Sequence, residues 1–452
     1  MKIIVAGLGK IGQAILSGLV AEGHEVVGIE NAPDVIEEVT NRYDVMCVLG
    51  SATDYETLSE AGADGCELFV AVTGSDEMNM LACFLARRMG AHHTIARIRN
   101  PEYNDSSLGF MSRELGLSFA INPELYAARE LYNLLKFPSA VNIETFSRGN
   151  FEMVELVLKD DSVLDQMTLV DMRRKYDAKF LVCAVRRGDE IFIPGGSFVL
   201  HAGDRIGITA SPVEITKLLK KMGILQKQAR SVMILGAGRI AYYLAKRLLA
   251  GGHNVKVIEK DKDRCEEFSA AVPGAQVLLG DGARPELLAE EGISAMDAFV
   301  ALTGMDEENI LLSFFASSQG VPKVISKANR AELAALAEKL GLDTLISPKK
   351  SISDVLTRYA RALENSLGSS VETLYKLMDG RAEAIEFNVS PDFAGLGVAL
   401  RDLHLKQNIL IAGIIRGRKP IIPTGDDMIL NDDKVVVIAA GLRLNDLADI
   451  LA

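Results

Sequence analysis

From Met1 to about Phe119 the chain alternates short runs of Val, Ile and Leu with stretches of helical periodicity. Residues 77–89 form one such stretch, with apolar positions spaced as on one face of a helix. Short apolar runs without polar alternation are typical of parallel strands that are covered on both faces. The pattern therefore predicts an α/β fold, a Rossmann-like doubly wound domain around a parallel sheet.

A different pattern follows this domain. Residues 123–135 begin with Pro and carry apolar side chains at helical spacing, which predicts a helix that links or exchanges between domains. From Phe151 to Ala210, short alternating strands surround two turn sequences, Arg187–Glu190 and Ala202–Arg205. We predict a small α+β domain for this stretch.

The second half of the chain repeats this order. The glycine-rich turn Gly7–Gly12 is matched by Gly236–Ala241 at an offset of 229 positions, and Glu30 is matched by Glu259 at the same offset. A second predicted helix near 352–363 and a second α+β stretch follow. Because the match continues through every segment, a whole half has been duplicated.

The repeat gives a predicted domain organisation, with the polar residues 226–230 between the halves. It consists of a Rossmann domain at 1–121, a linking helix at 122–139, an α+β domain at 140–225, a second Rossmann domain at 230–346, a second linking helix at 347–365 and a second α+β domain at 366–452.

The turn Gly7–Gly12 has the spacing of a dinucleotide-binding turn. A G-x-G-x-x-G pattern alone is a weak signal, but here an apolar strand precedes it, a helix follows it and Glu30 ends the next predicted strand. Gly7 would permit the tight turn, and Gly9 would let the backbone approach a pyrophosphate at the helix N-terminus. The Glu30 carboxylate can accept hydrogen bonds from ribose hydroxyls and would repel a 2′-phosphate, which favours NAD(H).

The second copy differs in detail. Its third glycine is replaced by Ala241, an accepted variant of the pattern, and Lys10 of the first turn is matched by Arg239. Glu259 is followed by a basic cluster made of Lys260, Lys262 and Arg264. This cluster weakens the preference for NAD there and leaves an adenine nucleotide with extra phosphates, ATP or ADP, as an alternative ligand.

Residues that follow later strands are expected to complete each cleft, because open α/β sheets bind ligands at the carboxyl ends of their strands. Thr73 and Thr303 follow one apolar strand, and Arg97 and Lys327 follow another. A phosphate contact and a surface ion pair are both open for these two cations.

The two predicted sites are not identical. The matching turns Gly50–Thr53 and Gly280–Ala283 offer different polar side chains, with Thr53 in the first and Asp281 in the second. We therefore expect the two clefts to be non-equivalent.

Composition narrows the class of protein. The net charge of -12 over 452 residues disfavours a nucleic-acid partner, which would require a basic surface, and it opposes adhesion to anionic lipid. No apolar run reaches the length of a membrane span, and the first residues lack the features of a signal peptide. The expectation is a cytoplasmic protein without direct membrane insertion. Its 5 scattered cysteines argue against a disulfide framework or a structural zinc.

A catalytic set is not evident in the sequence. His24 and His253 occupy matching turns and, like His92–His93, are interpreted as structural. The pairs Asp76–Glu77 and Asp306–Glu307 open helices, where capping of the helix dipole explains them. The leading hypothesis is therefore a nucleotide sensor and not an enzyme. An NAD-dependent oxidoreductase is the alternative. A redox-responsive transcriptional regulator is a third hypothesis, but the sequence lacks the basic helix-turn-helix that such a protein needs.

This tandem resembles the TrkA family, the peripheral NAD-binding subunits of Trk-type potassium uptake systems. The sequences AVTGSDEMN at 71–79, repeated as ALTGMDEEN at 301–309, and ARIRNPEY at 96–103 add specificity to the glycine turns. The resemblance implies two Rossmann RCK-N units, each followed by an RCK-C unit. It further implies a homotetrameric ring on the cytoplasmic side of the membrane, where NAD(H) or ATP/ADP would gate a potassium translocator subunit.

By matching position, the resemblance also implies which residues contact the dinucleotide. In the first half these are Gly7, Leu8, Gly9, Lys10, Ile11, Glu30, Thr73, Gly74 and Arg97, and in the second half Gly236, Ala237, Gly238, Arg239, Ile240, Glu259, Thr303 and Lys327. Ser51 departs from the Asp that is common in the family turn, so the resemblance leaves the contact in that turn open. Thr53 in the first half and Asp281 in the second are included among the candidate contacts.

Overall fold

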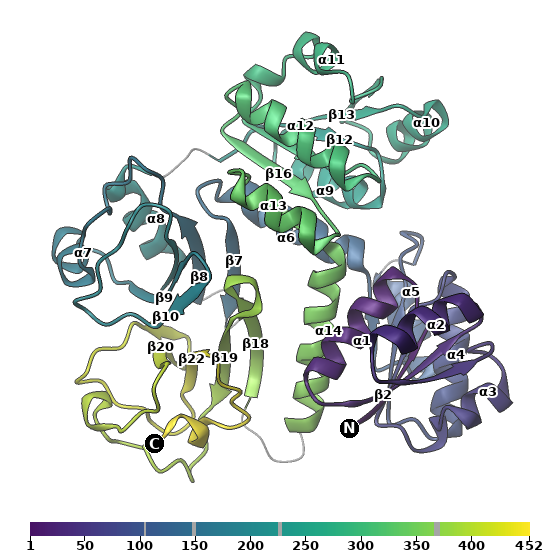
Figure 1. Cartoon of the computed structure of the whole chain (residues 1–452), viewed down its shortest axis with the longest axis horizontal. Coiled ribbons are helices and arrows are strands. Elements are labelled where there is room, and N and C mark those ends of the chain that lie inside the picture. The colour runs from purple at the N-terminus through teal and green to yellow at the C-terminus, as the bar shows by residue number, and fades with distance from the viewer. Residues whose placement is uncertain (104, 147–150, 225–227, 366–370) are drawn as a thin grey trace. The chain divides into compact units, whose positions relative to one another are not determined.

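The computed structural model describes residues 1–103, 105–146, 151–224, 228–365 and 371–452. They divide into two compact units, of which the first contains residues 1–129 and 346–364 and the second contains residues 130–345 and 365–452. The elements of both units are labelled in Figure 1.

The first unit is built on a six-stranded sheet in the order β3-β2-β1-β4-β5-β6. Its strands are β1 (Lys2–Ala6), β2 (Glu25–Glu30), β3 (Met46–Leu49), β4 (Leu68–Ala71), β5 (His93–Arg97) and β6 (Phe119–Ile121). They run parallel, and Ala6 at the end of β1 lies opposite both Ile29 and Ala71. The strand order changes direction between β1 and β4, which is where doubly wound sheets bind ligands.

Helices cover both faces of this sheet because its strands are apolar on both sides. They are α1 (Lys10–Ala21), α2 (Pro33–Arg42), α3 (Tyr55–Glu60), α4 (Asp76–Met89) and α5 (Asp105–Leu115), with a 3-10 turn η1 (Ala63–Gly65). Leu58 of α3 and Cys83 of α4 pack with Ile4 on one face. Ile15 of α1 packs with Ile3 on the other.

A helix from the second half of the sequence completes the first unit. Helix α14 (Pro348–Asn365) lies along α1, and its residues Ile352, Leu356 and Ala360 are fully buried in the core of that face (Figure 1). Ser353 Oγ donates a hydrogen bond of 2.8 Å to the carbonyl of Ala14. The linking helix of the second half thus packs on the Rossmann sheet of the first half.

The second Rossmann sheet repeats the strand order as β14-β13-β12-β15-β16-β17. Its strands are β12 (Ser231–Leu235), β13 (Asn254–Glu259), β14 (Gln276–Leu279), β15 (Ala298–Ala301), β16 (Lys323–Lys327) and β17 (Leu345–Ile346). Its helices are α9 (Arg239–Ala250), α10 (Lys262–Ala271), α11 (Pro285–Glu290), α12 (Asp306–Ser318) and α13 (Ala331–Lys339), with η3 (Ile293–Ala295).

The first linking helix, α6 (Pro123–Lys136), contacts this second sheet through its last turns. The Tyr132 ring meets the His253 ring edge-on at 6.1 Å, and the amide of Ala229 donates to the Leu135 carbonyl. Each linking helix therefore packs against the Rossmann sheet of the other half of the sequence.

Each Rossmann domain is followed by a five-stranded antiparallel sheet, with orders β10-β9-β11-β8-β7 and β18-β19-β22-β20-β21. The first contains β7 (Asn142–Phe146), β8 (Phe151–Val157), β9 (Leu181–Arg187), β10 (Glu190–Phe192) and β11 (Arg205–Ala210), with helices α7 (Leu169–Lys175) and α8 (Pro212–Met222). The second contains β18 (Val371–Leu377), β19 (Ala382–Asn388), β20 (Ile409–Arg416), β21 (Lys419–Ile421) and β22 (Lys434–Ala440), with η4 (Met378–Gly380), η5 (Leu400–Asp402) and η6 (Leu447–Ile450).

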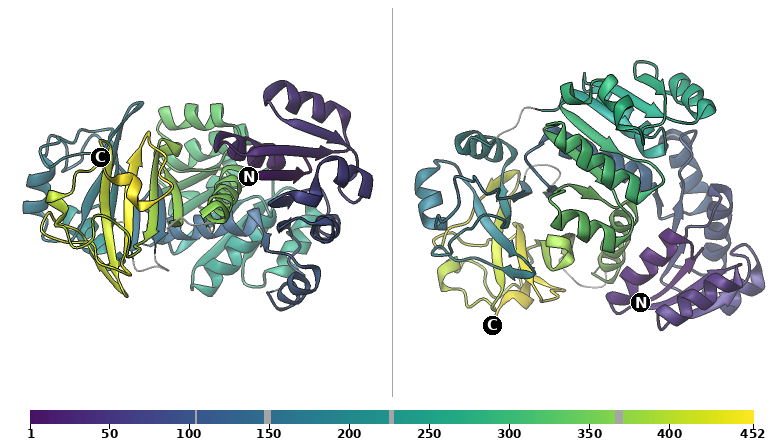
Figure 2. Two further views of the ribbon diagram at one scale, coloured as in Figure 1. Left: turned by 90° about the horizontal axis from the view of Figure 1, so that it is seen from below. Right: turned by 45° about the horizontal axis from the view of Figure 1, so that its top comes forward.

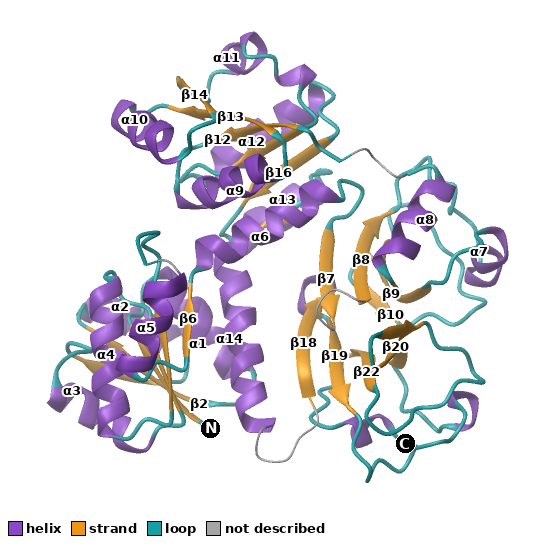
Figure 3. Cartoon of the chain, turned by 180° about the vertical axis from the view of Figure 1, so that it is seen from behind, coloured by secondary structure: helices purple, strands orange, loops and turns teal. Residues whose placement is uncertain are grey.

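These two antiparallel sheets share one core, and the views in Figures 2 and 3 show their strands side by side. Phe151 and Cys183 of the first sheet pack with Ala384 and Val436 of the second. A Cβ on Gly413 would lie 2.4 Å from the Phe151 ring, so the ring requires glycine there.

The fold class predicted from the sequence is confirmed, with differences at the ends of elements. Helix α14 begins at Pro348, four positions before the predicted start near 352, because its first turn is polar and carries no apolar periodicity. The turn expected at Arg187–Glu190 joins β9 to β10, with Gly188 at φ +58°. The predicted boundary at 226–230 and the predicted domain start at 366 fall partly outside the described residues.

Candidate functional site

The turn after β1 requires glycine at its first position. Gly7 has φ +94°, and a Cβ there would lie 2.8 Å from the backbone nitrogen of Thr73. Gly236 repeats this geometry at φ +95°, with the nearest atom, the Leu302 carbonyl carbon, 3.2 Å from the Cβ position. In both units the turn thus passes against the backbone that follows the neighbouring strand.

The second glycine of each turn begins a helix. Gly9 and Gly238 are the N-cap residues of α1 and α9, with extended backbone and no side-chain cap. By contrast, the Ser75 hydroxyl caps α4. A Cβ on Gly9 or Gly238 would meet nothing within 4 Å, so there is open space beside the first amides of both helices. Uncapped helix amides facing open space can bind an anionic group such as a phosphate.

The third glycine position of the turn differs between the two Rossmann units. A Cβ on Gly12 would lie 1.9 Å from the Gly7 carbonyl oxygen, which excludes any other residue without a shift of the backbone. In the second unit Ala241 occupies this position and is fully buried. The second turn therefore leaves room for a methyl group that the first turn does not.

Glu30 holds the glycine turn from the end of β2. Its carboxylate accepts hydrogen bonds from the amides of Leu8 at 2.7 Å, Asn31 at 2.8 Å and Ala32 at 3.2 Å. A carboxylate has about four acceptor positions, so this arrangement leaves capacity for one ribose hydroxyl. The ribose contact expected from the sequence stays a prediction, and the bond from Glu30 to the turn was not expected.

Glu259 makes the same three bonds in the second unit. It accepts from the amides of Ala237 at 2.8 Å, Lys260 at 2.8 Å and Asp261 at 3.1 Å. The side chains of the basic cluster Lys260, Lys262 and Arg264 are exposed. Both glutamates therefore set the position of the turn as well as presenting a carboxylate beside it.

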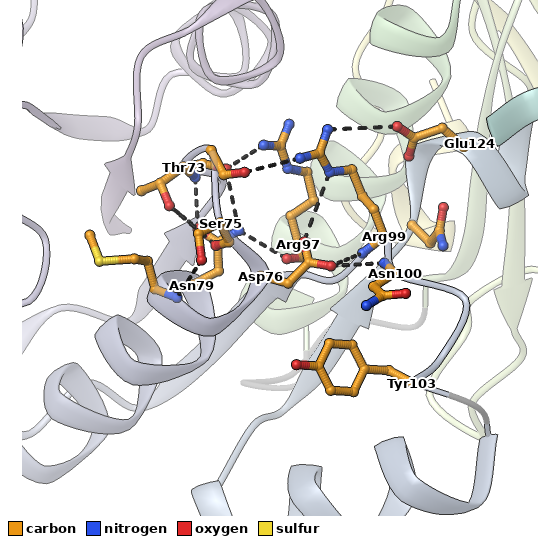
Figure 4. A network of polar contacts seen from close by, with 12 residues as sticks. Thr73, Ser75, Asp76, Asn79, Arg97, Arg99, Asn100, Tyr103 and Glu124 are labelled. Atoms are coloured by element: carbon orange, nitrogen blue, oxygen red, sulfur yellow. Dashed lines mark hydrogen bonds and ion pairs between the residues drawn. The ribbon is translucent and has the colours of Figure 1, made fainter. Parts of the chain in front are cut away.

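A buried asparagine, which sequence reasoning did not select, organises the loop after β4. Asn79 is fully buried, and its Oδ1 accepts from both the amide and the hydroxyl of Thr73 at 2.7 Å, while its Nδ2 donates to the Arg97 carbonyl at 2.9 Å (Figure 4). Asn309 makes the matching bonds to Thr303 and to the Lys327 carbonyl. An amide on the buried face of a helix, present in both copies, was the signal available in the sequence.

Asp76 is more than a helix cap. It is buried, and its Oδ2 accepts from the amides of Arg99 and Asn100, both at 2.8 Å, so it joins the loop after β4 to the segment after β5 (Figure 4). Asp306 accepts in the same way from the amides of Asn329 and Arg330. Both carboxylates lie in the first turn of their helices, as expected from the sequence. The bonds to amides about 23 residues away were not expected, because a repeated pattern in sequence does not reveal such partners.

The two predicted cations are the last residues of β5 and β16, and Arg97 is buried whereas Lys327 is partly exposed. Arg97 is 7% exposed and its guanidinium donates to the Thr73 carbonyl, which is incompatible with the alternative of a surface ion pair. Lys327 occupies the matching position, where burial lowers the pKa of its ammonium and the nearby Asp306 opposes that shift. Both cations thus lie at the carboxyl edge of the sheet.

The other predicted residues differ in their exposure. Lys10 and Arg239 are exposed as the first residues of their helices, and Gly74 is exposed in the loop after β4. The hydroxyls of Thr53 and Ser51 lie 2.9 Å apart, whereas Asp281 is exposed and accepts from the amide of Ala283. Leu8 is fully buried, while Ile11 and Ile240 are partly exposed.

The matching histidines pack in the interior. His24 is 7% exposed and its Nδ1 lies 3.2 Å from a Glu364 carboxylate oxygen, and His253 is 6% exposed and meets the Leu248 carbonyl and the Tyr132 ring. These contacts fit the structural role expected for both side chains. Among the described residues, no helix is long and apolar enough to cross a membrane.

Two parallel sheets, each with a glycine turn at a helix N-terminus and a glutamate at the end of its second strand, define a tandem of Rossmann units of the dinucleotide-binding class. The TrkA-N domain model matches residues 3–123 and 232–348, and the TrkA-C domain model matches residues 153–223 and 385–452. The chain therefore belongs to the TrkA family.

Curated relatives agree with this assignment over nearly the whole chain. The Trk system potassium uptake protein TrkA homolog of Archaeoglobus fulgidus is 33% identical over 439 residues, covering 97% of both chains. The Trk system potassium uptake protein TrkA of Vibrio alginolyticus is 32% identical over 446 residues, covering 97% of this chain and 95% of the other.

Solved structures share the fold. The RCK domain of GsuK has a TM-score of 0.64 at 18% identity and covers 97% of this chain and 92% of its own. The GsuK channel bound to NAD has a TM-score of 0.62 at 17% identity, covering 97% of this chain and 77% of the other. At this level of identity the likeness concerns the fold alone.

Proposed function

We propose that this chain is a nucleotide-sensing regulatory subunit that binds NAD(H), and ATP or ADP, and controls a membrane potassium translocator of the Trk type without catalysing a reaction. The observation that carries the proposal is the pair of uncapped helix N-termini at Gly9 and Gly238, each with open space beside it. The names of the relatives, which are Trk potassium uptake proteins, support the link to potassium transport.

The residues present fit a dinucleotide. The amides at the start of α1 would hold a diphosphate, the remaining acceptor capacity of Glu30 would hold a ribose hydroxyl, and the loop at Thr73 and Gly74 would lie against the second nucleoside. All residues assigned from the sequence, including Arg97, Thr53 and their partners in the second half, belong to this proposal. A bound dinucleotide would supply no chemistry here beyond its binding free energy.

The second unit is proposed to accept an adenine nucleotide with more phosphate. Three cations follow Glu259 and are exposed beside the end of β13, where they can neutralise additional negative charge: Lys260, Lys262 and Arg264. A structure titled as GsuK bound to ADP, with a TM-score of 0.51, is consistent with such a ligand in this fold.

We propose that the chain forms a homotetramer, which is held at the cytoplasmic face of the membrane by its translocator partner. We also propose the domain limits that the sequence predicts. Apolar side chains are exposed at matching positions of the two Rossmann units, with Leu81 and Leu311 at 48% and 68% and Phe110 and Leu340 at 57% and 63%. Repeated exposure of large apolar side chains favours burial against further copies of the chain.

Calorimetry on the purified full chain with NAD, NADH, ATP and ADP tests the binding step. We expect saturable heats for at least one dinucleotide, and a loss of binding when Gly9→Val fills the space beside α1. Potassium uptake by a strain that lacks the chain tests the role, and normal uptake would count against it. Turnover of NADH with small carbonyl compounds, lost in Glu30→Gln, would instead support the oxidoreductase alternative.

A further inference from the structure

Two successive carbonyls of the loop after β4 are held by arginines from the end of β5. The Arg97 guanidinium donates to the carbonyl of Thr73, and Arg99 Nη2 donates to the carbonyl of Gly74 at 3.1 Å. The amide of Arg99 in turn donates to Asp76. The loop that faces the nucleotide cleft and the segment after β5 are thus bound to each other at several points (Figure 4).

Arg99 also contacts the linking helix. Its Nη1 lies 3.9 Å from Oε1 of Glu124, in the first turn of α6, and the two side chains are 21% and 17% exposed. Helix α6 starts in the first compact unit, and its residues from Glu130 onward belong to the second. Arg99 is therefore bound at once to the loop of the cleft and to a helix that leaves this unit.

The second repeat does not have these residues. Asn329 occupies the position of Arg99, and its Nδ2 lies 3.4 Å from Asp306 Oδ1. The position of Glu124, directly after the helix-starting proline, is held by Lys349. An asparagine and a lysine cannot form the ion pair that an arginine and a glutamate form.

We infer that Arg99 is a positioning residue that couples the loop at residues 73–75 to α6, so that a nucleotide in the first cleft changes the order of α6. The inference rests on the proposed function. It gives the contacts through which nucleotide binding at one of the two sites affects α6. A ligand that fixes the loop also fixes the Gly74 carbonyl, and this holds the guanidinium against Glu124. By linkage, the free energy by which the bound ligand strengthens this contact equals the free energy by which the contact strengthens ligand binding.

Hydrogen exchange on the full chain, with and without saturating NADH or ATP, measures this coupling at residues 124–131. In the unaltered protein we expect the ligand to slow exchange in this segment about 3-fold or more, which corresponds to a stabilisation of roughly RT ln 3. In Arg99→Met the slowing should disappear, while calorimetry still detects nucleotide binding with affinity reduced by less than about 10-fold. The matched variant Asn329→Met should keep the slowing.

The variant Glu124→Met separates coupling from a loss of folding, because it removes the ion pair and leaves the bond from Arg99 to the Gly74 carbonyl in place. It should bind nucleotide with nearly unchanged affinity and lose most of the slowing. Slowing that persists in Arg99→Met, or a Glu124→Met chain that binds nucleotide with the slowing intact, would overturn the inference. If the unaltered chain binds no nucleotide in calorimetry, the proposed function itself fails, and that outcome is distinct from both.

Discussion

The two Rossmann units hold their exchanged helices by different means. In the first unit, Arg361 of α14 forms a buried ion pair with Glu22 at the end of α1, and both side chains are 6% exposed. In the second unit the position of Glu22 is Gly251, and a Cβ on Gly251 would lie 3.0 Å from the hydroxyl of Tyr132 in α6. The docking surface has therefore changed from a charge to an aromatic contact.

The clefts of the two units differ far less. Asn79 and Asn309 make the same bonds, as do Glu30 and Glu259. This contrast teaches that the loops around the cleft depend on one set of buried polar contacts, whereas the two sheets hold their linking helices through different contacts. The differences between the units should then appear first in the stability of helix docking and only second in the geometry of the turn.

The strongest test of this contrast removes one partner of the buried ion pair. Arg361→Met leaves Glu22 charged and buried, which should lower the free energy of unfolding of the first unit by about 3–5 kcal/mol. Urea unfolding monitored by hydrogen exchange in α14 measures it. The double variant with Glu22→Met should recover most of the loss. Arg330→Ala, which removes an exposed pair with Glu307 in the second unit, should leave the free energy of unfolding almost unchanged. If Arg361→Met and Arg330→Ala lower the free energy of unfolding equally, the buried ion pair does not stabilise helix docking in the first unit as proposed.

The third glycine of the turn tests the smaller geometric difference. Gly12→Ala should destabilise the first unit by roughly 1–3 kcal/mol, because its Cβ would meet the Gly7 carbonyl oxygen at 1.9 Å. The reverse change in the second unit, Ala241→Gly, should cost only about 1 kcal/mol through lost helix propensity. Thermal unfolding of both variants gives the comparison, and a Gly12→Ala protein as stable as Ala241→Gly would show that the first turn can widen without cost.

Sequence patterns predicted the repeat, the fold class and the glycine turns, because these depend on local periodicity and on spacing within one segment. They did not reveal the bonds that join segments. Glu30 was expected to face a ribose, yet it also accepts the Leu8 amide. Asp76 was expected to cap a helix, yet it binds amides beyond β5. The helix exchange was open to sequence reasoning only as a general expectation, since the apolar face of α14 does not specify which sheet it covers.

A buried lysine should make the stability of the second unit depend on pH. Burial lowers the pKa of Lys323 to about 7, and its Nζ donates to the Ala140 carbonyl at 2.6 Å and to the Thr344 hydroxyl at 2.9 Å. The charged groups that face it are Asp343 and Lys159. Above pH 7 the unfolded chain keeps a proton that the folded chain has lost, so the free energy of unfolding should rise by about 1 kcal/mol per pH unit towards 9.

Urea unfolding of the second unit at pH 7, 8 and 9 measures this slope. Lys323→Met should flatten it, because the titrating group is gone. His93 occupies the matching position in the first unit, and burial lowers its pKa, so it is neutral throughout this range and His93→Gln should leave the slope unchanged. A slope that survives in Lys323→Met would assign the pH dependence to another group.

The smallest expected effect concerns the aromatic contacts of the two exchanged helices. Tyr132 meets His253 edge-on at 6.1 Å in the second unit, and Tyr359 stacks on Phe119 at 5.7 Å in the first. Tyr132→Leu and Tyr359→Leu should each lower the free energy of unfolding of their own unit by about 0.5–1.5 kcal/mol, since both remove one ring contact.

Thermal unfolding of these two variants, with Tyr132→Phe as a control that keeps the ring, shows whether docking differs beyond the ion pair. Similar losses for both leucine variants would locate the whole difference between the units in Arg361 and Glu22, because the ring contacts then contribute equally. A loss at Tyr132 several times larger than at Tyr359 would mean that the second unit depends on its ring to replace the missing charge. In that case Tyr132→Phe should keep most of the stability, because it keeps the ring.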